Sequence, residues 1–258
     1  MLLSYPDRYL FVHLAKTGGT SVRAALSRRR WRDPLFWNSY VCHRISSISK
    51  HRIGCKIPRH APVVTAKEML PPLLFNELFK FAFVRNPWDR MVSAFYHFQR
   101  ERQDVLQQHR IVDVEQFIDW LLDVPLEDSV RPALIVALRR PQLEFLVDLQ
   151  GEIIVDFVGR YEHLLEDFEQ IRQRLSLKSI DLPHKRCSQR RRDYRTCYSD
   201  RLAARVGEHF ASDVKAFEYE FDDPSAVLSR VDGGHGPQWR QPKLMQSGRK
   251  KGHWHVKS

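Results

Sequence analysis

The sequence predicts an α/β fold in which a parallel sheet is flanked by helices. Short apolar segments rich in β-forming residues alternate along the chain with segments whose apolar residues recur at helical spacing. This alternation is typical of parallel strands joined by helices that cover both faces of the sheet. The chain has 258 residues, 43% of them hydrophobic, and no internal repeat, so we expect one such domain with extensions.

The first strand is expected over 9–14 and the first helix over 20–29, with a short turn between them. Two consecutive glycines let the turn fold tightly and approach a ligand. The hydroxyl residues after them can cap the helix and bind oxyanions, while the helix N-terminus and a lysine favour negative charge. We therefore predict an anion-binding loop formed by Lys16, Thr17, Gly18, Gly19, Thr20 and Ser21.

This loop differs from the Walker A loop of NTPases in the position of its lysine. Walker A has four residues between its first glycine and a Gly-Lys-Ser/Thr end, whereas Lys16 precedes both glycines here. The order disfavours a metal-dependent NTPase, and a nucleotide-dependent kinase remains as an alternative. A turn that only connects a strand to a helix is the other interpretation.

An irregular basic stretch at 30–60 follows, and then a strand is expected at 62–65 and a helix at 67–78. The next strand, at 79–84, has the sequence Phe-Lys-Phe-Ala-Phe-Val. It leads directly into a helix at 87–102, whose apolar residues form one stripe and are expected to be core. An asparagine and a proline at the junction suit the cap and the first position of this helix.

Arg85 stands where this strand ends and the helix begins. In open parallel sheets, ligands bind at that edge. Ser93 lies two turns into the helix and can offer its hydroxyl to the same ligand. The sequence therefore predicts a second anion-binding position at Arg85 and Ser93.

The rest of the chain continues the alternation and ends in a basic tail. Residues 223–258 contain few aliphatic residues and scattered lysines and arginines, which is typical of a mobile segment. We therefore expect one domain at 1–222. Its remaining elements are expected at 113–123 (helix), 140–149 (helix), 153–158 (strand), 163–176 (helix) and 199–216 (long helix).

The two anion-binding segments resemble those of sulfotransferases. Lys16 to Ser21 are similar to the loop that holds the 5′-phosphosulfate, and Arg85 to Phe95 to the 3′-phosphate motif. The resemblance is closer to the carbohydrate branch, which includes heparan sulfate 2-O-sulfotransferases, chondroitin sulfotransferases and small bacterial relatives. It continues in order through residues 155–162, 167–168, 198–200 and 217–221.

The resemblance implies a three-layer, P-loop-like α/β fold and a cosubstrate, 3′-phosphoadenosine 5′-phosphosulfate (PAPS), used without a metal. Lys16 would bond the oxygen between sulfur and the 5′-phosphate, and the loop N–H groups would hold that phosphate. Arg85 and Ser93 would bind the 3′-phosphate, where a planar guanidinium can bond two oxygens. Ser188 lies in a basic stretch similar to a loop that closes over the donor.

A hydroxyl acceptor needs a general base, and His60 is our candidate. A catalytic histidine occupies a similar place before the 3′-phosphate motif in the heparan sulfate 2-O-sulfotransferase relatives. Histidine titrates near neutrality and can accept the proton. His43 and His13 are the rival candidates for the base. His43 lies in the irregular stretch, whereas His13 lies inside the first strand and fits a structural role better.

The net charge of +11 suits several anionic partners. The sequence resemblance favours a carbohydrate or glycolipid acceptor, with possible contact to acidic surfaces, over a nucleic acid. A non-catalytic protein that binds polyanions or nucleic acids is a further alternative, and the oligomeric state stays open. The four cysteines lack zinc-site spacing and are expected as free thiols. No signal peptide or long apolar segment is found, so we expect a cytoplasmic protein.

Overall fold

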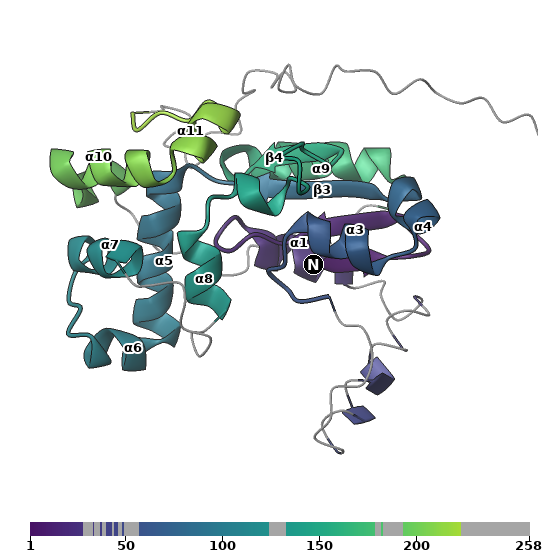
Figure 1. Ribbon diagram of the computed structural model, residues 1–258, viewed down its shortest axis with the longest axis horizontal. Helices are drawn as coiled ribbons and strands as arrows, with labels where there is room; N and C mark the ends of the chain where they lie inside the picture. Colours follow the sequence, from purple (N-terminus) through teal and green to yellow (C-terminus); the bar gives the residue numbers. More distant parts are fainter. Residues whose placement is uncertain are drawn as a thin grey trace, which may run out of the picture.

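In the part of the chain that the structure describes, four strands form one sheet with helices on both sides (Figure 1). The computed structural model describes residues 1–27, 57–123, 133–178 and 193–222, together with Leu182 and a few positions between 33 and 48. The strand order is β1-β2-β3-β4, with β1 antiparallel to β2 and the other neighbours parallel. The strands are β1 (Leu2–Ser4), β2 (Tyr9–Val12), β3 (Phe79–Val84) and β4 (Phe157–Arg160).

The predicted α/β fold with a parallel sheet is confirmed, and the antiparallel edge strand β1 is an addition to it. Ten α-helices within the described residues connect the strands and cover the sheet. They are α1 (Gly19–Ser27), α3 (Val63–Met69), α4 (Pro72–Glu77), α5 (Pro87–Glu101), α6 (Gln103–Gln108), α7 (Val114–Asp123), α8 (Ala133–Arg139), α9 (Leu164–Arg174), α10 (Asp200–His209) and α11 (Ala211–Phe217).

Alternate residues of the strands face two separate hydrophobic clusters, as the two-residue period of a strand requires. Phe11 and Phe81 belong to the cluster that contains the apolar residues of α1 and α9. Val12 and Ala82, one residue further along, belong to the larger cluster with α3, α5, α7, α8 and α10. The sheet is therefore the middle of three layers.

Helix α5 begins where the sequence predicts it, for the predicted reason. The side chain of Asn86 accepts hydrogen bonds from the backbone N–H groups of Trp88 (3.1 Å) and Asp89 (3.4 Å), and Pro87 takes the first helical position. A buried apolar face then packs the helix against the sheet. This junction fixes the direction in which the chain leaves β3.

Prolines account for two boundary errors in the sequence prediction. The helix expected at 67–78 is two helices, because Leu70 precedes Pro71 and has an extended backbone (φ −96°, ψ 148°). The helix expected at 140–149 is wrong, since α8 ends before Pro141 and only a 3₁₀ turn at Leu143–Phe145 follows.

Three further elements differ from the prediction. The β-branched residues at 62–65 suggest a strand, but from Val63 they form the first turn of α3, whose Val63 and Ala66 are buried. The strand expected at 153–158 begins later, because only the residues of β4 (Phe157–Arg160) pair with β3. The long helix at 199–216 is divided at Phe210 into α10 and α11.

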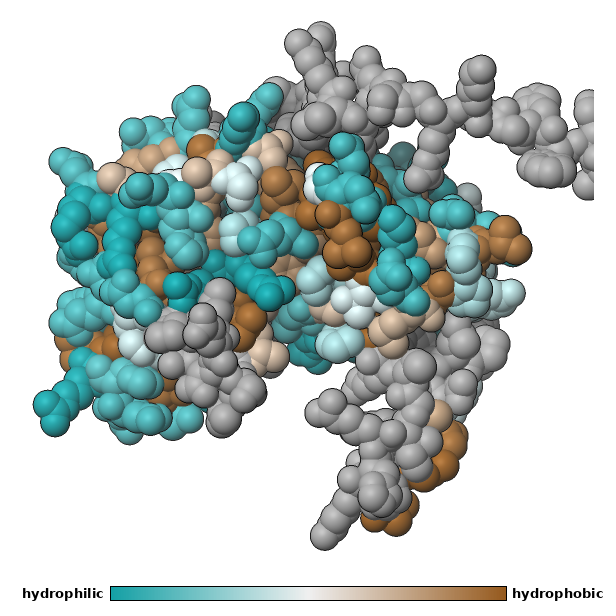
Figure 2. Space-filling view, viewed as in Figure 1, coloured by the Kyte–Doolittle hydropathy of each residue, from teal (hydrophilic) through white to brown (hydrophobic). Residues whose placement is uncertain are grey.

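On one face of the helical part, hydrophilic side chains cover the outer surface (Figure 2). Two arginines of α10, Arg201 and Arg205, form ion pairs with acidic residues of α7, among them Asp119. Such exposed pairs contribute little stability. Within the described residues, no helix is long and apolar enough to cross a membrane. The predicted tail at 223–258 and the domain boundary before it lie outside the described residues and stay predictions.

Candidate active site

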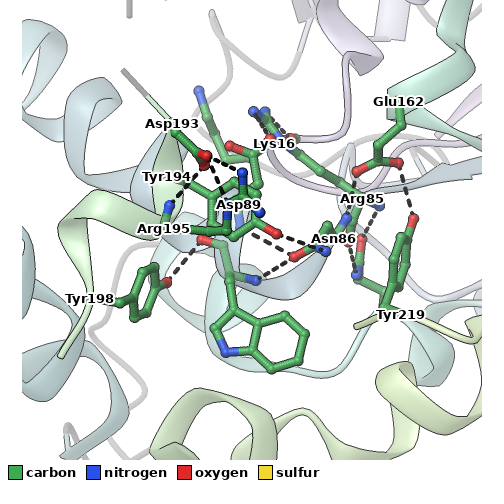
Figure 3. Close-up of polar contacts among 12 residues, drawn as sticks. Lys16, Arg85, Asn86, Asp89, Glu162, Asp193, Tyr194, Arg195, Tyr198 and Tyr219 are labelled. Carbon is green, nitrogen blue, oxygen red and sulfur yellow. Dashed lines mark hydrogen bonds and ion pairs between the residues drawn. The ribbon is translucent and has the colours of Figure 1, made fainter. Parts of the chain in front are cut away.

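Three loops meet at one edge of the sheet, because β2, β3 and β4 are parallel and end on the same side. The loop after β2 contains the predicted anion-binding residues, and the loop after β3 contains Arg85. The loop after β4 contributes Tyr161 and Glu162. Polar contacts from all three are drawn in Figure 3.

The loop after β2 turns through left-handed backbone conformations at Lys16 (φ 68°) and Gly18 (φ 76°). The carbonyl of Gly18 accepts the N–H groups of Ser21 (2.9 Å) and Val22 (3.3 Å), which starts α1. Thr17 is fully buried and its hydroxyl donates to the carbonyl of Leu14 (3.3 Å). The side chain of Thr17 therefore holds the loop in place, and only its backbone can face a ligand.

Both glycines are required by close packing. A Cβ atom on Gly18 would lie 3.0 Å from the ring of Tyr161, at a φ that L residues rarely adopt. A Cβ atom on Gly19 would lie 2.2 Å from the ring of His13. The loop is thus packed between His13 on one side and Tyr161 on the other. Thr20 is exposed and Ser21 is buried.

Arg85 is held by both neighbouring loops and by α5, and its bonds to Lys16 and Asp89 are drawn in Figure 3. Its Nε and Nη2 donate to the same carboxylate oxygen of Asp89 at 2.8 and 2.6 Å, and its Nη1 donates to the carbonyl of Lys16 at 3.1 Å. The guanidinium lies 3.9 Å from the ring centre of Tyr161, and the residue is only 3% exposed. Three of the five N–H groups of a guanidinium are therefore committed, which leaves two for a ligand.

Ser93 is buried in α5, one turn after Asp89, and so lies on the same side of the helix. Ser188 and His43 lie outside the described residues. The structure therefore brings together the loop after β2 and Arg85, as predicted, and leaves the expectations for Ser188 and His43 as they were.

The sequence analysis missed the role of Arg90, which is fully buried beneath the loop. Its Nε donates to the carbonyl of Ala15 (3.1 Å) and its Nη2 to that of Ala137 (2.7 Å). Burial lowers the pKa of Arg90 to about 10. Helical spacing places Arg90 on the side of α5 away from its apolar stripe, so no local pattern marked the residue as buried. Arg90 joins the loop to α5 and α8.

His60 reaches the site from the segment before α3. Its Nδ1 lies 2.9 Å from the carbonyl oxygen of His13, and the two rings are 4.8 Å apart. Burial lowers the pKa of His60 to about 4 and that of the more deeply buried His13 to about 2. Both rings are therefore neutral at neutral pH, and His60 lies beside the residue that packs on Gly19.

Glu162 has a defined role that the sequence did not show. One of its oxygens accepts the backbone N–H of Asn86 (2.8 Å) and the other accepts the hydroxyl of Tyr219 (3.2 Å). Glu162 therefore joins the loop after β3 to Tyr219, which follows α11. Burial raises the pKa of Glu162 to about 7.

Glu162→Gln is expected to remove a loss of stability that the wild-type protein undergoes between about pH 4.5 and 7. Because the folded-state pKa lies above the unfolded value of 4.5, the stability falls as pH rises from about 4.5 through 7. The glutamine can still accept from Asn86 and can donate to the Tyr219 hydroxyl. Thermal unfolding should give a Tm a few degrees above wild type at pH 8 and equal at pH 5, whereas exposed Glu166→Gln should change neither. An unchanged pH dependence would contradict this assignment.

Comparisons with known proteins give a family match and a relative of part of the chain. The family described as "Sulfotransferase family" matches residues 3–220. A protein of Archaeoglobus fulgidus, described as uncharacterized, is 28% identical over 107 residues, which is 40% of this chain and 72% of that protein. No solved structure matches. Among the described residues, no cluster of three or more histidine, cysteine or acidic side chains could hold a metal ion.

Proposed function

The chain belongs to the sulfotransferase family, which implies PAPS as the sulfuryl donor, and we propose that its acceptor is a hydroxyl of a carbohydrate or glycolipid. The observation that carries the proposal is the meeting of three groups at one sheet edge: the Lys16 loop, Arg85 and His60. The resemblance of the motifs to the carbohydrate branch supports the choice of acceptor. The net charge of +11 would concentrate both an anionic donor and an acidic glycan.

The donor would lie across the ends of β2 and β3. Its 5′-phosphosulfate would face the N-terminus of α1, where backbone N–H groups and the helix dipole favour negative charge. Its 3′-phosphate would bind the two remaining N–H groups of Arg85, with the hydroxyl of Ser93 one turn beyond Asp89. Since Arg85 bonds the carbonyl of Lys16, the two halves of the donor site are mechanically joined.

The transfer would follow the in-line scheme of phosphoryl transfer. The acceptor oxygen forms a bond to sulfur while the bond from sulfur to the 5′-phosphate oxygen breaks, and the leaving product is 3′-phosphoadenosine 5′-phosphate (PAP). Lys16 would stabilise the charge that develops on the leaving oxygen, and the acceptor proton would pass to His60. No metal is needed, because cationic side chains and backbone N–H groups supply the stabilisation.

The position of His60 suits a proton acceptor. A neutral imidazole that donates from Nδ1 to the His13 carbonyl carries its lone pair on Nε2. That tautomer would present Nε2 to the acceptor hydroxyl. His13, whose own ring packs on Gly19, is the rival base within the described residues, and His43 stays the other rival.

The direct test is transfer of ³⁵S from labelled PAPS to a panel of glycans and glycolipids in the presence of EDTA. Labelled product from one acceptor class would support the proposal. Phosphate transfer from ATP that requires Mg²⁺ would instead support the kinase alternative. Salt-dependent binding of RNA or polyanions, unaffected by the donor and without transfer, would support a non-catalytic protein.

Arg85→Lys is expected to weaken PAP binding by about 10- to 100-fold, which corresponds to roughly 1–3 kcal/mol. Lysine keeps a charge beside buried Asp89 but loses the planar fork. Arg85→Ala would also remove the partner of that carboxylate and so destabilise the fold. Calorimetric titration with PAP and with 5′-AMP distinguishes a loss of 3′-phosphate binding from a loss of folding. Arg85→Lys should lose the preference for PAP over 5′-AMP. A retained preference would contradict the 3′-phosphate assignment.

A further inference from the structure

Gln142 forms a paired hydrogen bond with the backbone of Arg85. The N–H of Arg85 donates to Oε1 of Gln142 (2.9 Å), and Nε2 of Gln142 donates to the carbonyl of Arg85 (2.8 Å). Gln142 is 0% exposed and comes from the turn after α8, far from Arg85 in the sequence. Both polar groups of the Arg85 backbone are thus satisfied by one buried side chain.

Asp213 fixes the orientation of that side chain. Its Oδ2 accepts from the backbone N–H (2.8 Å) and Nε2 (3.2 Å) of Gln142, and its Oδ1 accepts from the N–H of Leu143 (2.9 Å). Asp213 lies in α11 and is also 0% exposed. A carboxylate accepts hydrogen bonds, so Nε2 of Gln142 must face Asp213 and Oε1 must face Arg85. The reversed amide would place its oxygen against the carboxylate.

Gln142 and Asp213 together therefore fix the position of the backbone where β3 ends. In the ladder, Val84 is aligned with Arg160 of β4, and the next residue, Arg85, lies beyond the ends of the named strands. Gln142 supplies the hydrogen bonds that a further strand residue would have supplied. The guanidinium of Arg85 contacts Asp89, Tyr161 and the Lys16 carbonyl only while the Arg85 backbone keeps this position.

We propose that Gln142 and Asp213 are positioning residues for donor binding, which hold Arg85 where it meets the 3′-phosphate. We call Gln142 and Asp213, with their hydrogen bonds to each other and to the Arg85 backbone, the clamp. The inference rests on the proposed function, because the clamp is expected to act on PAPS binding. A displacement of about 1 Å in a binding group can cost about 100-fold in function. Neither side chain touches the donor in this account, so their effect passes through Arg85.

Three variants test the clamp: Gln142→Glu, Asp213→Asn and the double variant. Gln142→Glu loses the donor to the Arg85 carbonyl and places a second carboxylate against Asp213. Asp213→Asn removes the charge and replaces one of the two acceptor oxygens with an amide, which must then oppose an N–H of Gln142 or of Leu143. Each single variant should weaken PAP binding by about 10-fold or more, as expected when a buried hydrogen-bonding group loses its partner.

The double variant should recover part of the loss. With Glu at 142 and Asn at 213, the two carboxylates are no longer opposed, and the Asn amide can donate to the Glu oxygen. The recovery is only partial, because the backbone N–H at 142 then loses its acceptor and the Arg85 carbonyl still lacks its donor. A double-mutant cycle of PAP titrations should therefore show coupling between the two positions. In turnover, the KM for PAPS should rise in the single variants more than kcat at saturating donor falls.

The matched control is Leu121→Ala at a buried residue of α7, which lowers stability by leaving a cavity without removing a hydrogen bond from Gln142, Asp213 or Arg85. Its affinity for PAP should equal that of wild type. If the wild-type protein does not bind PAP, the proposed function fails. If wild type binds and the single variants bind equally well, or lose affinity only as the control does, the clamp is contradicted. A single variant that fails to fold leaves the other variant and the double variant to decide.

Discussion

Lys16→Met is expected to lower the rate of sulfuryl transfer by about 10²- to 10³-fold, the usual cost of removing one group that stabilises developing charge. Lys16 stands at the left-handed turn of the loop after β2, and its carbonyl accepts from Arg85. Methionine keeps the length of the side chain and leaves the backbone contact in place, so the change removes only the ammonium group. PAP binding should therefore fall much less than the rate.

The measurement is single-turnover transfer of ³⁵S from saturating PAPS, with thermal unfolding as the check on folding. Lys67→Met is a matched control, since Lys67 of α3 pairs with Asp148 outside the three loops of the site. Normal turnover in the Lys16 variant would contradict the proposed mechanism. A loss of PAP binding equal to the loss of rate would show that the residue binds the donor without stabilising the transition state.

His60→Asn is expected to lower kcat by about 10²- to 10⁴-fold, the usual contribution of a general base. Asparagine can still donate to the His13 carbonyl, so the segment before α3 should keep its place. His13→Asn is the comparison variant. If the rate follows His13 and not His60, the base is His13, and our sequence-based choice is wrong.

The pH profile gives a second test of the base. Burial lowers the pKa of His60 to about 4, so the ring is already neutral above about pH 5. The rate of wild type should be level through neutral pH and should fall as pH drops through 4. An inflection near 6.5 would show that a group with an ordinary histidine pKa controls the rate.

The stability of the fold, like the rate, should decrease at low pH. A neutral, buried histidine contributes stability that is present above its unfolded pKa of 6.5 and is lost as pH falls through the folded pKa. We therefore expect the free energy of unfolding to decrease from pH 6.5 downward. Replacing either histidine with asparagine should make this decrease smaller.

Local patterns in the sequence were sufficient to predict the positions of the two loops that form the candidate site. The strand–turn–helix units at β2–α1 and β3–α5 each depend on residues within about ten positions: apolar strands, glycines in the turn, and an Asn-Pro cap. Parallel strands then place both loops at one edge. Lys16 and Arg85 are therefore adjacent in the structure as the sequence predicts.

The parts that the sequence did not reveal depend on contacts between distant segments. Gln142 and Asp213 are 57 and 128 positions from Arg85, and nothing in their local sequence marks them as its support. The segment 62–65 has β-branched residues, yet burial of Val63 and Ala66 in the core favours a helix there. Tertiary packing overrides local preference in such cases.

The central claim is that this site binds PAP through its 3′-phosphate without a metal. The most direct measurement is calorimetric titration of the purified protein with PAP in EDTA, with 5′-AMP as the ligand that lacks only that phosphate. The account predicts tight binding of PAP and weak or no binding of 5′-AMP. Equal binding of both ligands, or binding of neither, would contradict it and leave the loops at 13–18 and 85–86 as parts of the scaffold.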